Sequence, residues 1–332
     1  MNTFLFMIKT IFCMKTPTTI SRKIEIILIS ISFISCQKNE IAPNNYSGES
    51  EEFTEQSVLF KTQGPSFRGV YIDGFSTKIG IQSSEDSILN WCLKNNLNEI
   101  SLYGINAIIT SNKTVLLNNF IGKAKAAPYN INVSFVAASA TTVNNEYSNY
   151  YLTHTNKFDA ITSEYEYWNS GNSFQTFQIQ LNAMSSINQA TSGAIKRQLY
   201  ISKFVDASGI ISQDTTMARE VVQESDRIFL VNYSTNAYNL SSTTLSKMKT
   251  VANAAKKLNK IMDIVILFNL NRSSVDPNIF NYVSVNGSNH AFSDAYTKFK
   301  MDYNAVSFSN KTSLNIVGFQ LYNYSEASLA RP

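Results

Sequence analysis

The fold is indicated first by three consecutive runs, "FRGVYIDGF" (67–75), "SSEDSILNWCLKNN" (83–96) and "NEISLYGI" (98–105). The first and third runs are short, apolar and rich in β-branched and aromatic residues, which is typical of strands. The middle run starts with residues suited to a helix N-terminus, and its apolar side chains recur at helical spacing: Ile88, Leu89, Cys92 and Leu93. These runs therefore predict a strand, a helix and a second strand.

The same alternation of strand and helix continues along the chain. Further strands are predicted at 131–139, 158–168, 196–204, 226–234, 261–269 and 315–324. Helices are predicted between them at 114–127, 173–191, 214–224, 243–259 and 288–302. Eight strands alternating with helices predict an α/β fold, a (β/α)8 TIM-type barrel over residues 65–332. Only "SEASLARP" (325–332) follows the last strand, so we expect the last helix to be missing or the chain to be cut short.

Composition narrows the possible functions. The net charge of +4 is spread thinly over 332 residues, and the folded part has no basic block, so nucleic acid is not expected as a partner. Two histidines and three cysteines are too few for a zinc cluster or a disulfide framework, and neither a metal nor a cofactor is expected. A doubly wound open sheet is the main alternative fold, but no Gly-rich phosphate loop follows a strand to support its nucleotide-binding versions.

The N-terminus has the features of an export signal. Basic residues in "MKTPTTISRK" (14–23) precede the apolar run "IEIILISISFIS" (24–35), and Cys36 follows directly. This arrangement resembles a bacterial lipoprotein signal, which implies cleavage of residues 1–35, a lipid anchor at Cys36, and a place at the outer membrane or cell surface. A plain secretory signal or an N-terminal membrane anchor remains the alternative. Translation could start at Met14 rather than Met1.

Residues 36–64 are expected to form a disordered tether. The segment "QKNEIAPNNYSGESEEFTEQS" (37–57) is rich in acids and amides and has few large apolar residues. Such a composition cannot bury a core. The predicted domain order is therefore a signal peptide at 1–35, a tether at 36–64 and the barrel at 65–332.

The fourth predicted strand carries a cluster of acids in "FDAITSEYEYWN" (158–169). Successive side chains on a strand alternate between its two faces, so Thr162, Glu164 and Glu166 share one face. Catalytic groups of such barrels lie at the carboxyl ends of the strands. Two carboxylates are therefore predicted to converge at the barrel mouth, where their proximity should raise one pKa.

This segment resembles the strand-four motif of the family 18 glycoside hydrolases, the chitinases and endo-β-N-acetylglucosaminidases. Their motif is D-G-x-D-x-D-x-E. Asp159 falls on its first Asp, Thr162 on the second, Glu164 on the third and Glu166 on the catalytic Glu. Two of these four positions differ from the motif in residue type, since Thr162 and Glu164 both stand where the family has Asp.

Two further strands extend the resemblance. Strand six of that family ends in M-x-Y-D or M-x-Y-N, and "LVNYS" (230–234) places Tyr233 on the Tyr. Strand eight of the family ends with a Trp, and "GFQLYNY" (318–324) offers Tyr322 or Tyr324 in that region. The similarity in element order covers residues 67–324.

The resemblance implies a reaction and a role for each residue. Glu166 would be the general acid that protonates the glycosidic oxygen, and the substrate's own 2-acetamido oxygen would attack the anomeric carbon. Glu164 would orient the acetamido group, and Tyr233 would donate a hydrogen bond to its oxygen. The protein would then be a surface hydrolase acting on N-acetylglucosamine-containing glycans, free or on glycoproteins.

Other residues are candidates for substrate binding, although packing or loop capping is an equally ordinary role for each: Trp168, Asp73, Tyr103, Asn232 and Tyr322. An aromatic ring near the mouth can stack on a sugar face. Two alternatives to an active hydrolase stay open. One is a catalytically inactive, glycan-binding lipoprotein of the same fold, and the other is a structural surface protein that binds no glycan.

Overall fold

Eight strands of the described residues close into a barrel in which each strand is parallel to the next and β8 pairs with β1. The computed structural model describes residues 64–204, 215–236 and 239–332. The strands are β1 (Phe67–Ile72), β2 (Glu99–Leu102), β3 (Asn132–Ala137), β4 (Ala160–Ser163), β5 (Lys196–Ile201), β6 (Arg227–Val231), β7 (Met262–Asn269) and β8 (Leu314–Tyr322). The predicted (β/α)8 barrel is confirmed.

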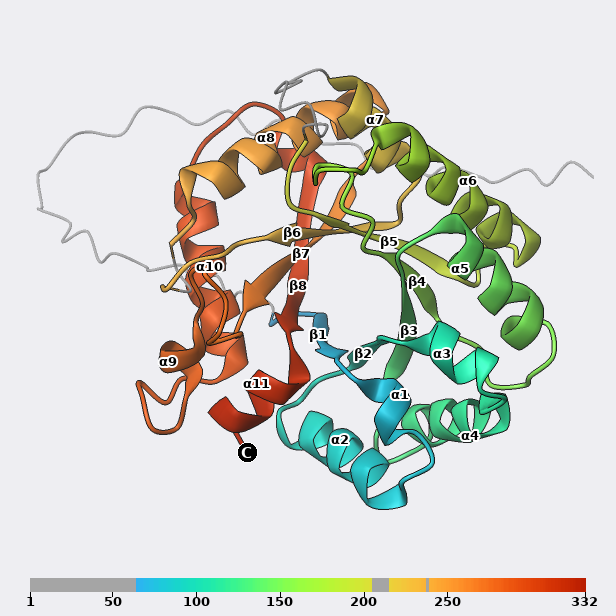
Figure 1. Ribbon diagram of the computed structural model, residues 1–332. Helices are drawn as coiled ribbons and strands as arrows, with labels where there is room; N and C mark the ends of the chain where they lie inside the picture. The colour runs from blue at the N-terminus through green and yellow to red at the C-terminus, as the bar shows by residue number, and fades with distance from the viewer. Residues whose placement is uncertain (1–63, 205–214, 237–238) are drawn as a thin grey trace, which may run out of the picture. The chain divides into compact units, whose positions relative to one another are not determined.

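Helices form a ring outside the strands (Figure 1). The longer ones are α2 (Gln82–Lys94), α4 (Thr114–Lys125), α6 (Phe174–Ala190), α7 (Thr215–Gln223), α8 (Ser242–Lys257) and α10 (Phe292–Ala305). Shorter segments are α1 (Phe75–Lys78), α3 (Ile105–Thr110), α5 (Ala140–Glu146), the π-helix η1 (Tyr147–Tyr151), α9 (Phe280–Val283), the 3-10 turn η2 (Lys311–Ser313) and α11 (Tyr324–Ala330). Apolar helix faces cover the outside of the barrel, as on α2, where Cys92 is fully buried.

The inside of the barrel is unusually polar at mid-height. Thr162 of β4 donates to Gln198 of β5 (Oγ1 to Oε1, 2.7 Å), and Gln198 donates to Glu99 of β2 (Nε2 to Oε1, 2.7 Å). Ser134 of β3 donates to Ser101 of β2 (2.8 Å). Buried polar groups need such partners because an unmade hydrogen bond in the interior is costly. The strands therefore place a hydrogen-bonded layer beneath the barrel mouth.

Strands β1 and β8 approach each other so closely that two positions require glycine. A Cβ on Gly69 would lie 1.9 Å from Oε1 of Gln320, and a Cβ on Gly318 would lie 1.8 Å from the carbonyl oxygen of Phe67. Both glycines lie where β1 pairs with β8, since Phe67 is in register with Gly318 and Gly69 with Gln320. Any larger residue would force these two strands or their side chains apart.

The structure corrects two details of the sequence predictions. A seven-residue helix, α11, follows β8, so the expectation that the last helix is missing is wrong. Strand β4 ends at Ser163, although the sequence run predicts a strand to residue 168. The predicted signal peptide, Cys36 and the tether lie outside the described residues, apart from Gly64. No helix of the described part is long and apolar enough to cross a membrane.

Candidate active site

A polar cavity of about 280 Å³ lies at the carboxyl ends of strands β4 to β8. Its lining consists of carboxylates, tyrosine rings, amides, one serine and one aliphatic side chain: Glu164, Glu166, Tyr200, Tyr233, Leu267, Asn269, Asn271, Ser274, Asp276 and Tyr322. This is the end of the barrel where the fold places catalytic groups. The cavity therefore brings together four of the residues singled out from the sequence, namely Glu164, Glu166, Tyr233 and Tyr322.

Glu164 is held at the inner end of this cavity. Its backbone NH donates to the carbonyl of Ala137 on β3 (3.0 Å), so the chain continues beside β3 for one residue beyond β4. The Tyr103 hydroxyl donates to its Oε2. Burial raises the pKa of Glu164 to about 7, while the hydroxyls of Tyr103 and Tyr71 oppose this rise and the charge of Glu166 adds to it. The predicted raised pKa is thus found on Glu164, and burial rather than the second carboxylate is its main cause.

Glu166 lies two residues further along and is half-buried. Its carboxylate accepts a hydrogen bond from the amide of Asn169, and its backbone carbonyl accepts one from the amide of Asn172 (2.8 Å). These contacts form a tight turn between β4 and α6. Glu166 therefore enters the cavity from a turn rather than from the strand itself.

Tyrosine hydroxyls from several strands surround the two carboxylates. Tyr200 of β5 and Tyr233, just after β6, lie close enough to shift each other's pKa. Burial raises the pKa of Tyr233 to about 12, so its hydroxyl stays protonated and can donate at neutral pH. Tyr71 of β1 is fully buried, and its ring contacts those of Tyr103 and Tyr322. The cavity wall is thus rich in neutral hydrogen-bond donors.

Thr162 lies below the cavity and is fully buried. Its hydroxyl is engaged by Gln198 (2.7 Å) and lies 3.4 Å from that of Ser134. The sequence comparison aligned Thr162 with the second Asp of the motif, on the same strand face as Glu164. The structure instead places a hydrogen-bonded, uncharged residue at this level of the barrel.

Three predicted binding residues have other contacts. Trp168 is 8% exposed and packs against Tyr200 with ring centroids 5.6 Å apart, outside the cavity lining. Asn232 is buried, and its Oδ1 accepts from Thr244 of α8 (3.0 Å), so it faces the helix layer and its prediction as a mouth residue is wrong. Asp73 accepts from the backbone NH of Ser325 (3.0 Å) at the start of α11. Tyr103, by contrast, reaches the site through Glu164.

Sequence reasoning missed Tyr200, Tyr71 and Asp276 as site residues. Tyr200 follows the inward-facing Gln198 by two positions, so the strand period could have identified it. Tyr71 likewise follows Gly69 by two positions on β1. Asp276 lies in the loop after β7, where no periodicity indicates which side chains point inward.

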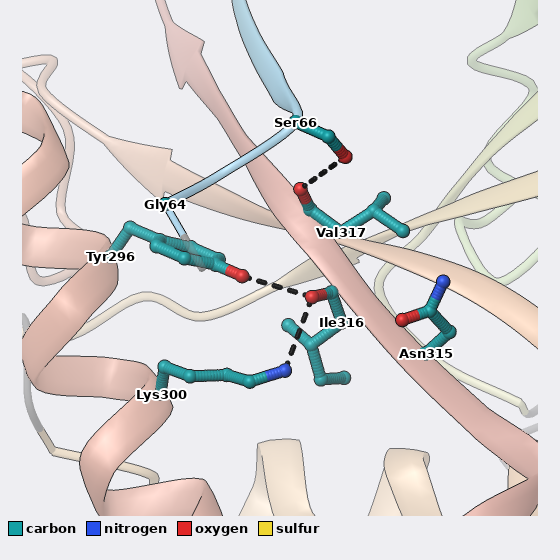
Figure 2. Close-up of a pocket in the computed structure, with 7 residues that line it drawn as sticks. All are labelled: Gly64, Ser66, Tyr296, Lys300, Asn315, Ile316 and Val317. Carbon is teal, nitrogen blue, oxygen red and sulfur yellow. Dashed lines mark hydrogen bonds between the residues drawn. The ribbon is translucent and has the colours of Figure 1, made fainter. Parts of the chain in front are cut away.

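A larger cavity of about 370 Å³ lies elsewhere, at the amino end of β8 beside α10 (Figure 2). Tyr296 and Lys300 both donate to the carbonyl of Ile316, at 2.9 and 3.2 Å. The lining contains no carboxylate among the described residues. The side chains of Tyr296 and Lys300 from α10 are already hydrogen-bonded to β8. Size alone does not make this cavity the better candidate. Within the described ranges, no group of three or more His, Cys, Asp or Glu side chains is arranged to hold a metal ion.

Comparisons with known proteins do not identify a family for this chain. No protein-family model matches the chain, and no curated protein matches it. A xylanase and alpha-amylase inhibitor protein from Scadoxus multiflorus matches with a TM-score of 0.44 at 11% identity, covering 79% of this chain and 94% of the other. Orotidine 5'-monophosphate decarboxylase from Methanocaldococcus jannaschii gives 0.41 at 8% identity, with 79% and 90% covered.

A family 18 chitinase from Crocus vernus matches with a TM-score of 0.38 at 18% identity, covering 64% of this chain and 74% of the other. Proteins with different functions thus match at similar scores. Because a fold does not define a function, none of these likenesses identifies the reaction. Any functional conclusion has to come from the cavity and its side chains.

Proposed function

We propose that this protein is a glycoside hydrolase that acts on N-acetylglucosamine-containing glycans by substrate-assisted, retaining hydrolysis. The observation that carries the proposal is that Glu164, Glu166 and Tyr233 line one cavity at the carboxyl ends of the strands. These are the three residues to which the strand-four and strand-six motifs assign chemistry. Tyr233 follows β6, whereas Glu164 and Glu166 follow β4, so only the fold of the barrel brings the three residues together.

In this mechanism Glu166 acts as acid and then as base. It gives a proton to the glycosidic oxygen while the bond from that oxygen to the anomeric carbon breaks. The substrate's acetamido oxygen forms a bond to the same carbon, so no protein nucleophile is needed. Water then attacks the anomeric carbon while the bond from that carbon to the acetamido oxygen breaks. The water gives a proton to Glu166, and the product keeps the original anomeric configuration.

Glu164 and Tyr233 would act on the acetamido group. The carboxylate of Glu164 orients the NH of the acetamido group. It also balances the positive charge that develops when the acetamido oxygen closes a ring with the anomeric carbon. The Tyr233 hydroxyl donates to the acetamido oxygen. Tyr103 fixes the carboxylate of Glu164 by donating to Oε2. Such preorganised groups are the main source of electrostatic stabilisation in enzyme sites.

A catalytically inactive, glycan-binding protein of the same fold is the second candidate. The observation that favours it is Thr162, whose hydroxyl is committed to Gln198 and carries no charge toward Glu164. Glu164 is also one methylene longer than the Asp of the motif. Because a displacement of about 1 Å can cost on the order of a hundredfold in rate, these two changes bear directly on turnover.

The test is hydrolysis of chitooligosaccharides and of a high-mannose glycoprotein by the wild-type protein and by Glu166→Gln. An active enzyme releases reducing ends, and Glu166→Gln slows this release by about a hundredfold or more while glycan binding persists. Glu220→Gln is the matched control, because the Glu220 carboxylate also accepts from an amide, that of Gln178 (2.6 Å), but lies outside the cavity.

If the protein binds glycans without cleaving them, the same assay should give a different outcome. Both the wild-type and Glu166→Gln proteins would retain glycan without cleaving it, and Tyr322→Ala would weaken retention because Tyr322 lines the cavity. If a folded wild-type protein neither binds nor cleaves any of these glycans, both candidate functions are wrong.

We further propose that the barrel is displayed at the outer membrane or cell surface through a lipid on Cys36. The basic and apolar segments before this residue support the proposal. Metabolic labelling with a fatty acid should mark the wild-type protein and leave Cys36→Ser unlabelled. Equal labelling of both proteins would contradict lipidation at this position.

A further inference from the structure

An arginine at the amino end of the barrel is fixed in place without using its hydrogen-bond donors. Arg227 begins β6, and its guanidinium lies over the ring of the buried Phe67, with Cζ 4.5 Å from the ring centroid. Its Nε is buried and has no hydrogen-bond partner within the described part of the chain. Its Nη1 lies 3.7 Å from Oε2 of Glu99, which makes an ion pair but is too long for a hydrogen bond. The terminal nitrogens of the guanidinium can therefore still donate to a ligand.

A cavity of about 160 Å³ lies beside this guanidinium, among the amino ends of strands β1 to β6. Its volume is that of about five water molecules, which also suits a small anion. Gln198 lines this cavity and accepts a hydrogen bond from Thr162, which lies below the candidate active site. The buried polar layer of the barrel therefore separates the two cavities.

The two acids that line this cavity are already compensated. Asp159 accepts a hydrogen bond from Nζ of Lys125 (2.8 Å), so its charge is paired. Glu99 is 4% exposed, and burial raises its pKa to about 7, so it carries only part of a negative charge at neutral pH. Arg227 and Lys196, which also line the cavity, therefore give it an excess of positive charge.

We propose that the cavity at the amino end of the barrel binds a small oxyanion, such as a carboxylate, phosphate or sulfate, through the guanidinium of Arg227. The planar fork of a guanidinium matches the paired oxygens of such groups. The contact with Phe67 fixes the plane of the fork before the anion arrives. Lys196 is exposed and lines the same cavity, so its ammonium adds attraction at the rim. This site lies at the opposite end of the barrel from Glu164 and does not depend on glycan hydrolysis.

The neighbouring Glu99 should couple anion binding to uptake of a proton. Burial, the largest cause, and the charge of Asp159 raise the pKa of Glu99, whereas Arg227 and Gln198 lower it; Lys196 is the other charged group of the lining. A bound anion adds a negative charge and interacts with the same guanidinium, so it should raise this pKa further. Anion affinity should therefore be highest at low pH and fall as the pH rises through about 7.

Isothermal titration calorimetry with sodium sulfate and with sodium acetate tests the site, at one ionic strength set with sodium chloride. We expect saturable binding to the wild-type protein and binding weaker by about tenfold or more to Arg227→Gln. Arg68→Gln is the matched control, because it removes the same charge from β1 at the same end of the barrel. The Arg68 guanidinium donates to the carbonyls of Pro65 and Asn96 and does not line the cavity, so this variant should bind like the wild type.

Two further variants test the site even if Arg227→Gln does not fold. Lys196→Gln changes an exposed side chain and should weaken binding by a few-fold. Glu99→Gln should bind without pH dependence, whereas the wild-type protein should bind about tenfold more weakly at about pH 8 than at about pH 6. Tighter binding of acetate would assign the site to planar carboxylates, and tighter binding of sulfate to tetrahedral oxyanions.

Three results would contradict this inference. A folded wild-type protein that gives no saturable binding of either anion would exclude the site. Equal weakening by Arg68→Gln and Arg227→Gln would show a general effect of charge rather than a site. A wild-type affinity that does not change with pH would exclude the coupling to Glu99.

Discussion

The two ends of the barrel interior each contain a glutamate, fully buried at Glu99 and half-buried at Glu164, and the two differ in their neighbours. Glu164 lies at the carboxyl end and Glu99 at the amino end, and burial raises the pKa of each to about 7. Glu99 accepts from Gln198 (2.7 Å) and pairs with Arg227 (3.7 Å), beside a cavity of about 160 Å³. Glu164 has no cation beside it among the residues lining its larger cavity.

The comparison shows that burial alone does not identify a catalytic acid. A carboxylate paired with an arginine and an amide is held by the protein itself, and breaking such a pair mainly costs stability. A carboxylate that meets only hydroxyl groups, a second acid and a cavity can still interact with a ligand. The carboxyl end of a barrel is also the end where reactions occur. The proposed function therefore uses Glu164 and gives Glu99 no part in the reaction.

The largest expected effect is a difference in hydrolysis rate between variants of Glu164 and of Glu99. Glu164→Gln should reduce glycan hydrolysis by about a hundredfold or more, the scale expected for losing one preorganised electrostatic group. Glu99→Gln should leave the rate within a few-fold of the wild type, because it lies at the opposite end of the barrel. Steady-state kinetics on a chitooligosaccharide measure both. Similar losses in the two variants would remove the distinction between the two ends.

The next effect is a pH dependence that both glutamates should share. Each has a pKa raised from 4.5 to about 7 on folding, so the folded protein favours the protonated form. Their contribution to stability is therefore complete below pH 4.5 and is lost as the pH rises through about 7. The loss is on the order of 3 kcal/mol for each group.

Urea unfolding between pH 4.5 and 8 checks this prediction. Glu164→Gln and Glu99→Gln should each flatten the decline in the free energy of unfolding. A wild-type protein whose stability rises steadily over this range would show that neither carboxyl is protonated in the folded state.

A smaller effect concerns stability and the contact between strands β1 and β8. Gly69→Ala should destabilise the protein by about 1–3 kcal/mol, because the added methyl group overlaps Gln320 inside a filled barrel. Gly64→Ala is the matched control, since nothing lies within 4 Å of its added Cβ. Thermal unfolding of both variants measures the difference. Equal melting temperatures would contradict close packing at the β1–β8 seam.

The smallest effect refines the environment of Glu164. Tyr103→Phe removes the hydroxyl that donates to its carboxylate, and this hydroxyl lowers the pKa of Glu164. The pKa should therefore rise, and the acid side of the pH–activity profile should move to higher pH, with a few-fold loss near pH 6. A pH profile of kcat/KM tests this. An unchanged acid limb would mean that Glu164 need not be ionised for turnover.

The period of two along each strand explains both the successes and the failures of prediction. It correctly grouped Glu164 and Glu166, and strand order placed Tyr233 and Tyr322 at the same end of the barrel. The same period shows that Asn232, next to Tyr233, must face outward. Trp168 instead packs against Tyr200 outside the cavity lining, because the turn that begins at Glu166 changes the direction of the chain before Trp168.

Other features left no periodic signal in the sequence. Asp276 reaches the cavity from a loop, where side-chain direction depends on tertiary contacts. Helix α11 has seven residues, too few to show a helical repeat, and it is fixed by Asp73 and by its N-cap Asn323. The repeated strand and helix units thus defined the fold, whereas the rim of the site depended on loops that the pattern does not describe.

The central claim is that this cavity cleaves glycosidic bonds with help from the substrate's acetamido group. Proton NMR of the first product released from a fully acetylated chitooligosaccharide tests it most directly. The account predicts a reducing end that appears first as the β anomer, with release by Glu166→Gln slowed by about a hundredfold or more. A product that appears first as the α anomer, or no product from a folded wild-type protein, would contradict it.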